Sequence, residues 1–121
     1  MMSSVDLKSK VPNPFFPGVY DVNAQDVLAL KKELVLIDVR EPSEFTGELG
    51  HIADSSLIPL GSLPDRLHEI PQDKTVIFIC RSGNRSAHAA AFALEHGYKD
   101  VFNMAGGMLF WNSIMLPVER N

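Results

Sequence analysis

The chain has 121 residues, of which 45% are hydrophobic and 21% are charged, and its net charge is −4. This composition is typical of one globular domain, and it argues against disordered and fibrous classes. An acidic chain without a run of Lys and Arg also lacks the usual nucleic-acid surface, and no apolar stretch is long enough to span a bilayer, so we expect a cytoplasmic protein that binds neither nucleic acid nor membrane.

Residues 1–18 are predicted to be an extended lead-in. Their prolines, Pro12, Pro14 and Pro17, lack amide hydrogens, so the segment can form neither a regular helix nor a central strand. The stretch "GVYDV" can form a short first strand, and Asn23 is a suitable N-cap for a helix in "AQDVLALKKE".

Strand and helix signals then alternate. The runs "LVLIDV" (34–39) and "TVIFIC" (75–80) are continuous and apolar, as in strands that are buried on both faces, and "SLIPL" and "DVFNM" are weaker strands. Helical patterns lie in "SLPDRLHEI" and "SAHAAAFALEHG". This order predicts an α/β fold with a central parallel sheet of about five strands and helices on both faces. We expect the domain to cover residues 19–118, with a tail at 119–121.

The single cysteine, Cys80, ends the strongest strand and opens the loop "CRSGNRS", which we expect to curl over a helix that starts near Ala87. Ligands of open parallel sheets bind at this edge, where backbone amides and helix N-termini bind anions. Gly83 allows a tight turn, while Arg81 and Arg85 add positive charge. These features favour the thiolate, and hence a reactive sulfur.

The alternative interpretation of Cys80 is an inert core residue, because free cysteine is among the most buried residue types. A core cysteine, however, does not need a glycine and two arginines in the next five residues. The loop therefore favours a nucleophile. The four histidines lie in neither CxxC nor HExxH motifs, so we expect no metal and no cofactor.

The stretches "LIDVREPSEF", "GHIADSSLIPL", "VIFICRSGNRSA" and "NMAGGMLFWNSIMLPV" occur in an order and at a spacing that resemble single-domain rhodaneses, a family of sulfurtransferases. The resemblance covers residues 19–118 and implies a rhodanese-like domain. It assigns the catalytic cysteine to Cys80. It also assigns substrate binding to the loop residues that follow, namely Arg81, Ser82, Gly83, Asn84, Arg85 and Ser86.

The resemblance implies a two-step transfer in which Cys80 takes a sulfur from thiosulfate or a persulfide donor and passes it to a thiol, to cyanide or to a protein acceptor. Because the chain has no second cysteine, an internal disulfide cannot discharge the persulfide. The acceptor must therefore be an external molecule.

Three further residues could support the site. Asp38 and Arg40 follow a strand end at the same edge as Cys80, so Arg40 could attract the donor and Asp38 could orient the loop; alternatively, Arg40 pairs with Glu44 one helical turn away. His51 matches the family's "GHI" and could be a general acid, although a structural hydrogen bond is favoured.

The C-terminal motif "GGMLFW" predicts a tight turn at Gly106 and Gly107 and a core or rim aromatic at Trp111. Some positions depart from the family's pattern. Asp54 and Met115 stand where glycine is usual, and Leu57 stands where asparagine is common. These departures put donor access and rim shape in doubt.

Two rival functions remain. Phosphatases and arsenate reductases of a related fold carry C-x5-R, whereas this loop is C-x4-R, with Ser86 where their arginine stands; phosphoryl transfer depends on closely positioned donors. A non-catalytic interaction or sulfur-relay module is the second rival.

Arg85 is expected either to bind the donor anion or to pair with Asp38.

Overall fold

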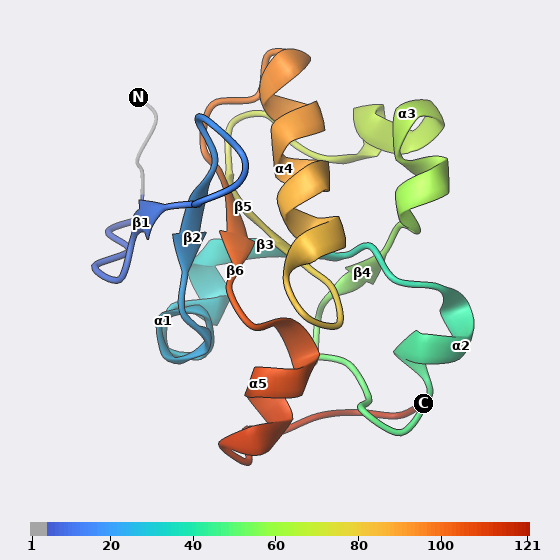
Figure 1. Ribbon diagram of the computed structural model, residues 1–121. Helices are drawn as coiled ribbons and strands as arrows, with labels where there is room; N and C mark the ends of the chain where they lie inside the picture. Colours follow the sequence, from blue (N-terminus) through green and yellow to red (C-terminus); the bar gives the residue numbers. More distant parts are fainter. Residues whose placement is uncertain (1–4) are drawn as a thin grey trace.

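The central sheet has six strands in the order β1-β2-β6-β5-β3-β4 (Figure 1). The computed structural model describes residues 5–121, so the first four residues of the predicted lead-in lie outside the described part. β1 runs antiparallel to β2, and the other neighbours are parallel. The strands are β1 (Val11–Pro12), β2 (Tyr20–Val22), β3 (Leu34–Asp38), β4 (Ser56–Leu57), β5 (Thr75–Ile79) and β6 (Val101–Met104).

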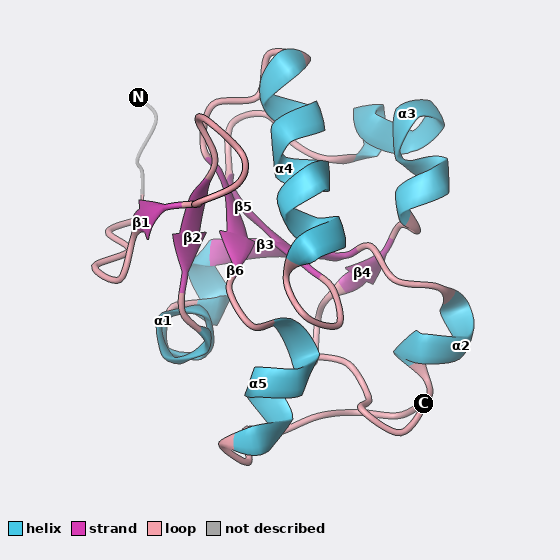
Figure 2. Ribbon diagram, viewed as in Figure 1, coloured by secondary structure: helices cyan, strands magenta, loops and turns pink. Residues whose placement is uncertain are grey.

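Helices cover both faces of the sheet (Figure 2), which confirms the predicted α/β class. Phe78 of β5 packs in one core cluster with residues of α3 and α4, whereas Ile77 packs on the opposite face with residues of α1 and α5. The helices are α1 (Ala24–Ala29), α2 (Pro42–Phe45), α3 (Leu63–Arg66), α4 (Asn84–Glu95) and α5 (Gly107–Ser113), and 3-10 turns occur at Lys31–Glu33, Leu60–Ser62 and Leu67–Glu69.

The two strongest predicted strands, β3 and β5, lie side by side in the middle of the sheet, in register from Leu34 with Thr75 to Asp38 with Ile79. All five residues of β5 are buried, because neighbouring strands flank it and helices cover both of its faces. This central position explains why the sequence of β5 is continuously apolar. It also places Cys80, which follows β5, at the centre of the sheet edge formed by the carboxyl ends of the strands.

The N-terminal lead-in contributes the sixth strand. Residues 11 and 12 pair with β2 at the edge of the sheet, where the missing amide hydrogen of Pro12 is tolerated. Leu7 is 4% exposed and packs in the core cluster on the α1 and α5 face. Within residues 5–121, no helix is both long enough and apolar enough to cross a membrane.

Helix α4 begins at Asn84, three residues before the predicted start. Its N-cap is Gly83, whose φ of 105° lies in the left-handed region, so the chain turns sharply into the helix. The loop proper is consequently short, and Arg85 lies in the first helical turn.

Candidate active site

Cys80 follows β5 directly and is almost completely buried, with 1% of its surface exposed. On one side its side chain packs in the apolar cluster beneath α4. On the other side the sulfur faces polar groups: the backbone amide of Gly83 donates to Sγ over 3.1 Å, and Ser86 Oγ lies 3.2 Å from Sγ. Cys80 thus has the loop contacts that were predicted for a nucleophile, and it is also buried, as the alternative interpretation as a core residue predicted.

Helix α5 holds the loop from beneath. The amides of Met108 and Leu109 donate to the carbonyl oxygens of Cys80 and Arg81, each over 2.9 Å. The approach is so close that a Cβ on Gly107 would lie 2.5 Å from the Cys80 carbonyl oxygen. Gly107, predicted as part of a tight turn, therefore also allows α5 to approach the loop backbone.

These bonds also orient the loop amides. In a trans peptide the carbonyl and the next amide point in opposite directions, so the amides of Arg81 and Ser82 are turned away from α5. The amides of residues 84–86 form the first turn of α4 and have no intrahelical acceptor. Within residues 5–121, no hydrogen bond uses these five amides. They are free to bind an anion or a sulfur atom.

Arg85 pairs with Glu44 of α2 through two hydrogen bonds of 2.8 Å. These hydrogen bonds lower the pKa of Glu44 to about 2 and raise the pKa of Arg85. The predicted pairs of Arg85 with Asp38 and of Arg40 with the Glu44 carboxylate were therefore wrong, whereas binding of a donor anion by Arg85 stays a prediction. Glu44 lies 41 residues from Arg85 in the chain, so only the tertiary fold brings the two side chains together.

Asp38 and Arg40 form a buried ion pair, each 1% exposed. Arg40 Nε and Nη2 donate to the two carboxylate oxygens of Asp38 over 2.9 and 2.7 Å. Arg40 also donates to the carbonyl oxygens of Glu44 and Gly50, over 3.3 and 2.7 Å. These contacts join the end of β3 to α2 and to the segment before β4.

His51 belongs to the same region and contacts the backbone. Its Nδ1 lies 2.7 Å from the Phe45 carbonyl oxygen, and its ring stacks on the Phe45 ring with centroids 3.6 Å apart. Its backbone exchanges two hydrogen bonds of 2.8 Å with Glu119. The structure gives His51 contacts with α2 and with the C-terminal segment.

A chain of polar side chains leads from Cys80 to the surface. Ser86 Oγ lies 2.5 Å from Asn103 Oδ1, and Asn103 Nδ2 donates to Asp21 over 2.9 Å. Asn13 of the lead-in also donates to Asp21 over 2.9 Å. Sequence reasoning missed Asn103, although a polar residue within the apolar strand "DVFNM" was a usable signal.

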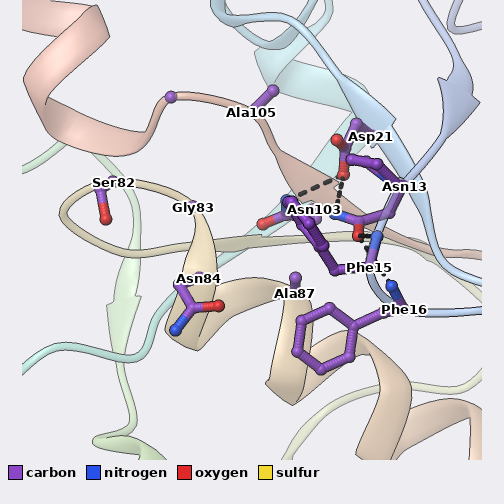
Figure 3. A pocket seen from close by; sticks show the side chains of 12 residues that line it. Asn13, Phe15, Phe16, Asp21, Ser82, Gly83, Asn84, Ala87, Asn103 and Ala105 are labelled. Atoms are coloured by element: carbon purple, nitrogen blue, oxygen red, sulfur yellow. Dashed lines mark hydrogen bonds between the residues drawn. The ribbon is translucent and has the colours of Figure 1, made fainter.

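Two cavities flank the loop. One, of about 210 Å³, lies between the loop residues Ser82–Asn84 and the lead-in residues Asn13–Phe16, with Asp21 and Asn103 between them (Figure 3). The other, of about 440 Å³, lies between α2 and the loop and is lined by residues that include Arg40, Glu44, Arg81 and Leu109. The loop is thus open to molecules from two sides.

The departures from the family's pattern lie away from these cavities. Asp54 and Met115, the two residues that replace the usual glycines, have φ values of 70° and 62°, the left-handed region that favours glycine. Neither lines a cavity beside the loop. Their effect therefore falls on the backbone of turns away from the loop.

Trp111 is fully buried, and its Nε1 donates to the Pro117 carbonyl oxygen over 2.9 Å.

Comparison with known proteins gives consistent matches. A sulfurtransferase of Allochromatium vinosum is 38% identical over 91 residues, covering 75% of this chain and 83% of that protein. Thiosulfate sulfurtransferase GlpE of Pseudomonas syringae is 38% identical over 79 residues, covering 65% and 73% of the two chains. The crystal structure of a rhodanese-related protein from Thermoplasma volcanium has a TM-score of 0.78 at 34% identity, covering 84% of this chain and 98% of that chain.

The family match spans most of the chain. The family described as "Rhodanese-like domain" matches residues 23–114, a range that includes β3, β5, β6 and the whole loop. The similar proteins agree with it, both in sequence and in the arrangement of the sheet and helices. The chain therefore belongs to the family of rhodanese-like domains.

Proposed function

We propose that this protein is a sulfurtransferase that moves a sulfane sulfur from thiosulfate or a persulfide to a thiophilic acceptor through a persulfide on Cys80. The observation that carries the proposal is the set of unused backbone amides that follows Cys80, next to the amide that already donates to its sulfur. The names of the sulfurtransferase relatives support the reaction class, and that of GlpE supports thiosulfate as a donor.

In the first step the Cys80 thiolate attacks the outer sulfur of thiosulfate. A new S–S bond forms on Cys80, the S–S bond of thiosulfate breaks, and sulfite leaves with the electron pair. The free amides of the loop and of the α4 N-terminus stabilise the anion, and the exposed Arg81 adds positive charge. Ser82 and Asn84 are also exposed on this loop and could contact the donor.

In the second step an acceptor thiolate or cyanide attacks the outer sulfur of the Cys80 persulfide. The persulfide S–S bond breaks, and its electron pair returns to Cys80 as the thiolate. Because Cys80 is the only cysteine of the chain, the acceptor is a separate molecule. A small acceptor and a protein acceptor that docks beside the loop both meet this requirement.

The test is intact-mass spectrometry after incubation with thiosulfate. We expect a mass gain of one sulfur, lost again on addition of cyanide, and no gain in Cys80→Ser. An aryl phosphate incubated in parallel separates the rival enzyme class. Phosphate release that depends on Cys80 would assign the chain to the phosphatases, and a folded protein that gains no sulfur from thiosulfate or from a small persulfide would point to a non-catalytic module.

A further inference from the structure

The hydrogen bonds that join Ser86, Asn103 and Asp21 behind Cys80 have a fixed donor-to-acceptor direction. The Asp21 carboxylate can only accept hydrogen bonds, so the Asn103 side chain must present Nδ2 to it, over 2.9 Å. Asn103 then presents Oδ1 to Ser86, which lies 2.5 Å away. An amide oxygen also only accepts, so the single hydroxyl proton of Ser86 points to Asn103.

The strands place these groups on one face of the sheet. Asn103 is paired with Asp21 on one side and with Phe78 on the other, so the three side chains share a face. Cys80 follows Phe78 by two residues and packs in the same core cluster. Ser86, in the first turn of α4, lies over this face and is fully buried, and Asn103 is 2% exposed.

At its far end from Cys80, this series of hydrogen-bonded side chains is held by Asn13 of the N-terminal lead-in. Asn13 Oδ1 accepts from the backbone amides of Phe15 and Phe16 over 2.8 and 2.9 Å, so its Nδ2 is the group that faces Asp21. Figure 3 shows Asn13, Asp21 and Asn103 joined in this order along the wall of the smaller cavity.

We propose that Asn103 is a positioning residue that holds the Ser86 proton away from Cys80 while the sulfur is a thiol, and that ionisation of the thiol requires this proton to turn to the sulfur. In the thiol state Cys80 S–H donates to Ser86 Oγ, 3.2 Å away. When solvent base removes the thiol proton, the Ser86 hydroxyl rotates from Asn103 Oδ1 to the anionic Sγ. The bond lost at Asn103 offsets part of the bond gained at sulfur.

Charged groups also lie around the Cys80 loop, and their effects on the sulfur add to that of this switch. They are Arg81 and Arg85 on the loop and on α4, Glu44 of α2 paired with Arg85, Asp38 and Arg40 at the end of β3, and Asp21 behind Asn103. Only Asp21 is bonded to Asn103. A variant that alters Asn103 or Asp21 therefore leaves the hydrogen bonds and ion pairs of the other charged groups intact.

The test measures the thiolate of Cys80 directly, by ultraviolet absorbance against pH, with Cys80→Ser as the blank. Asn103→Leu frees the Ser86 proton for the sulfur, so we expect the midpoint to fall by up to about one pH unit, the size of the neutral hydrogen bond to Asn103 that ionisation no longer has to break. In Ser86→Ala the same Asn103→Leu change should shift the midpoint by less than about a third of that amount. An equal shift with and without Ser86 would overturn the proposal.

A second pair of variants decides the question even if Asn103→Leu does not fold. Asp21→Ala lets the Asn103 amide turn round, so the midpoint should fall as in Asn103→Leu. Asp21→Asn removes the same charge but keeps an oxygen acceptor for Asn103, so it should leave the midpoint nearly unchanged. Equal shifts in both Asp21 variants, or no shift in either, would refute the role of the hydrogen-bond direction.

The inference rests on the proposed role of Cys80, but its readout needs no sulfur donor. If the midpoints shift as expected and thiosulfate adds no sulfur, the switch stands and the proposed function fails. If sulfur is transferred and the Ser86 background makes no difference, the proposed function stands and the switch fails.

Discussion

Arg85 in the first turn of α4 donates to both carboxylate oxygens of Glu44 in α2, each over 2.8 Å. The bond joins the helix that follows the Cys80 loop to the segment that follows β3. Two nitrogens bound to two oxygens fix the guanidinium in one orientation. Arg85 therefore fixes the carboxylate of Glu44, which lines the larger cavity, and the exposed positive charge of the loop is Arg81.

The first prediction concerns this pair and pH. The pKa of Glu44 is about 2 in the folded protein against an ordinary 4.5, so its contribution to stability is complete above pH 4.5 and is lost as the pH falls towards 2. Glu44→Gln should lower the free energy of unfolding by about 1 kcal/mol at neutral pH, since both side chains are partly exposed. The difference from wild type should shrink towards pH 2, as measured by urea unfolding.

Glu69→Gln is the matched control, because Glu69 pairs with Arg66 in the same two-bond manner but on the exposed surface. We expect a smaller loss there. Arg85→Ala and Glu44→Gln should also be strongly non-additive, since each removes the same interaction. A fully additive double variant would show that the two residues act independently.

The second prediction concerns Met115, whose side chain is 89% exposed and whose φ is 62°. Met115→Gly removes the strain of the left-handed conformation and loses little packing, so it should stabilise the protein by about 0.5–1 kcal/mol. Met115→Ala keeps the Cβ and should give no such gain. Thermal unfolding of the two variants measures the difference, and an equal effect of both would rule out backbone strain.

The third prediction concerns Gly107, where a Cβ would lie 2.5 Å from the Cys80 and Arg81 backbone. Gly107→Ala should cost about 3 kcal/mol through clash and strain together, and it should displace the loop and reduce persulfide formation. Gly97→Ala is the control, because its φ of 94° carries strain but no atom lies within 4 Å of its Cβ. It should cost about 1 kcal/mol and leave sulfur transfer unchanged.

The fourth prediction concerns access to Cys80, which is 1% exposed. Iodoacetamide should modify the folded protein faster than a bulky aromatic maleimide does, relative to the rates of the two reagents with the urea-unfolded chain. A factor of about ten or more is expected, since a steric cost of about 1.4 kcal/mol is sufficient for it. Equal protection against the two reagents would mean that the sulfur reacts only after global unfolding.

The sequence predicted the strands best where their apolar runs were continuous. β3 and β5 were predicted to within one residue at each end, because burial on both faces demands such runs. β1 was missed, because a segment with three prolines carries no strand signal, and its pairing with β2 depends on the tertiary fold. The start of α4 was predicted three residues too late. Arg85 in its first turn pairs with Glu44, a contact with a distant part of the chain that a local pattern does not show.

The site was predictable in its local part and not in its long-range part. The loop from Cys80 to Ser86 is contiguous, so its composition and its place after β5 indicated the anion-binding arrangement. The pairs of Arg85 with Glu44 and of Ser86 with Asn103 join residues 41 and 17 positions apart, and periodicity contains no information on which distant side chains meet. Asp38 and Arg40 were correctly placed at one edge, but their mutual ion pair was not foreseen.

Pro12, at the outer edge of the sheet, has a consequence for self-association. An unpaired strand edge can recruit a strand from another molecule and so begin aggregation. Here the outer edge is a two-residue strand with Pro12 in it, and the opposite edge, β4, is also two residues long and is followed closely by Pro59. Neither edge offers a row of donors and acceptors long enough for strand addition, so the sheet is protected against edge-to-edge polymerisation.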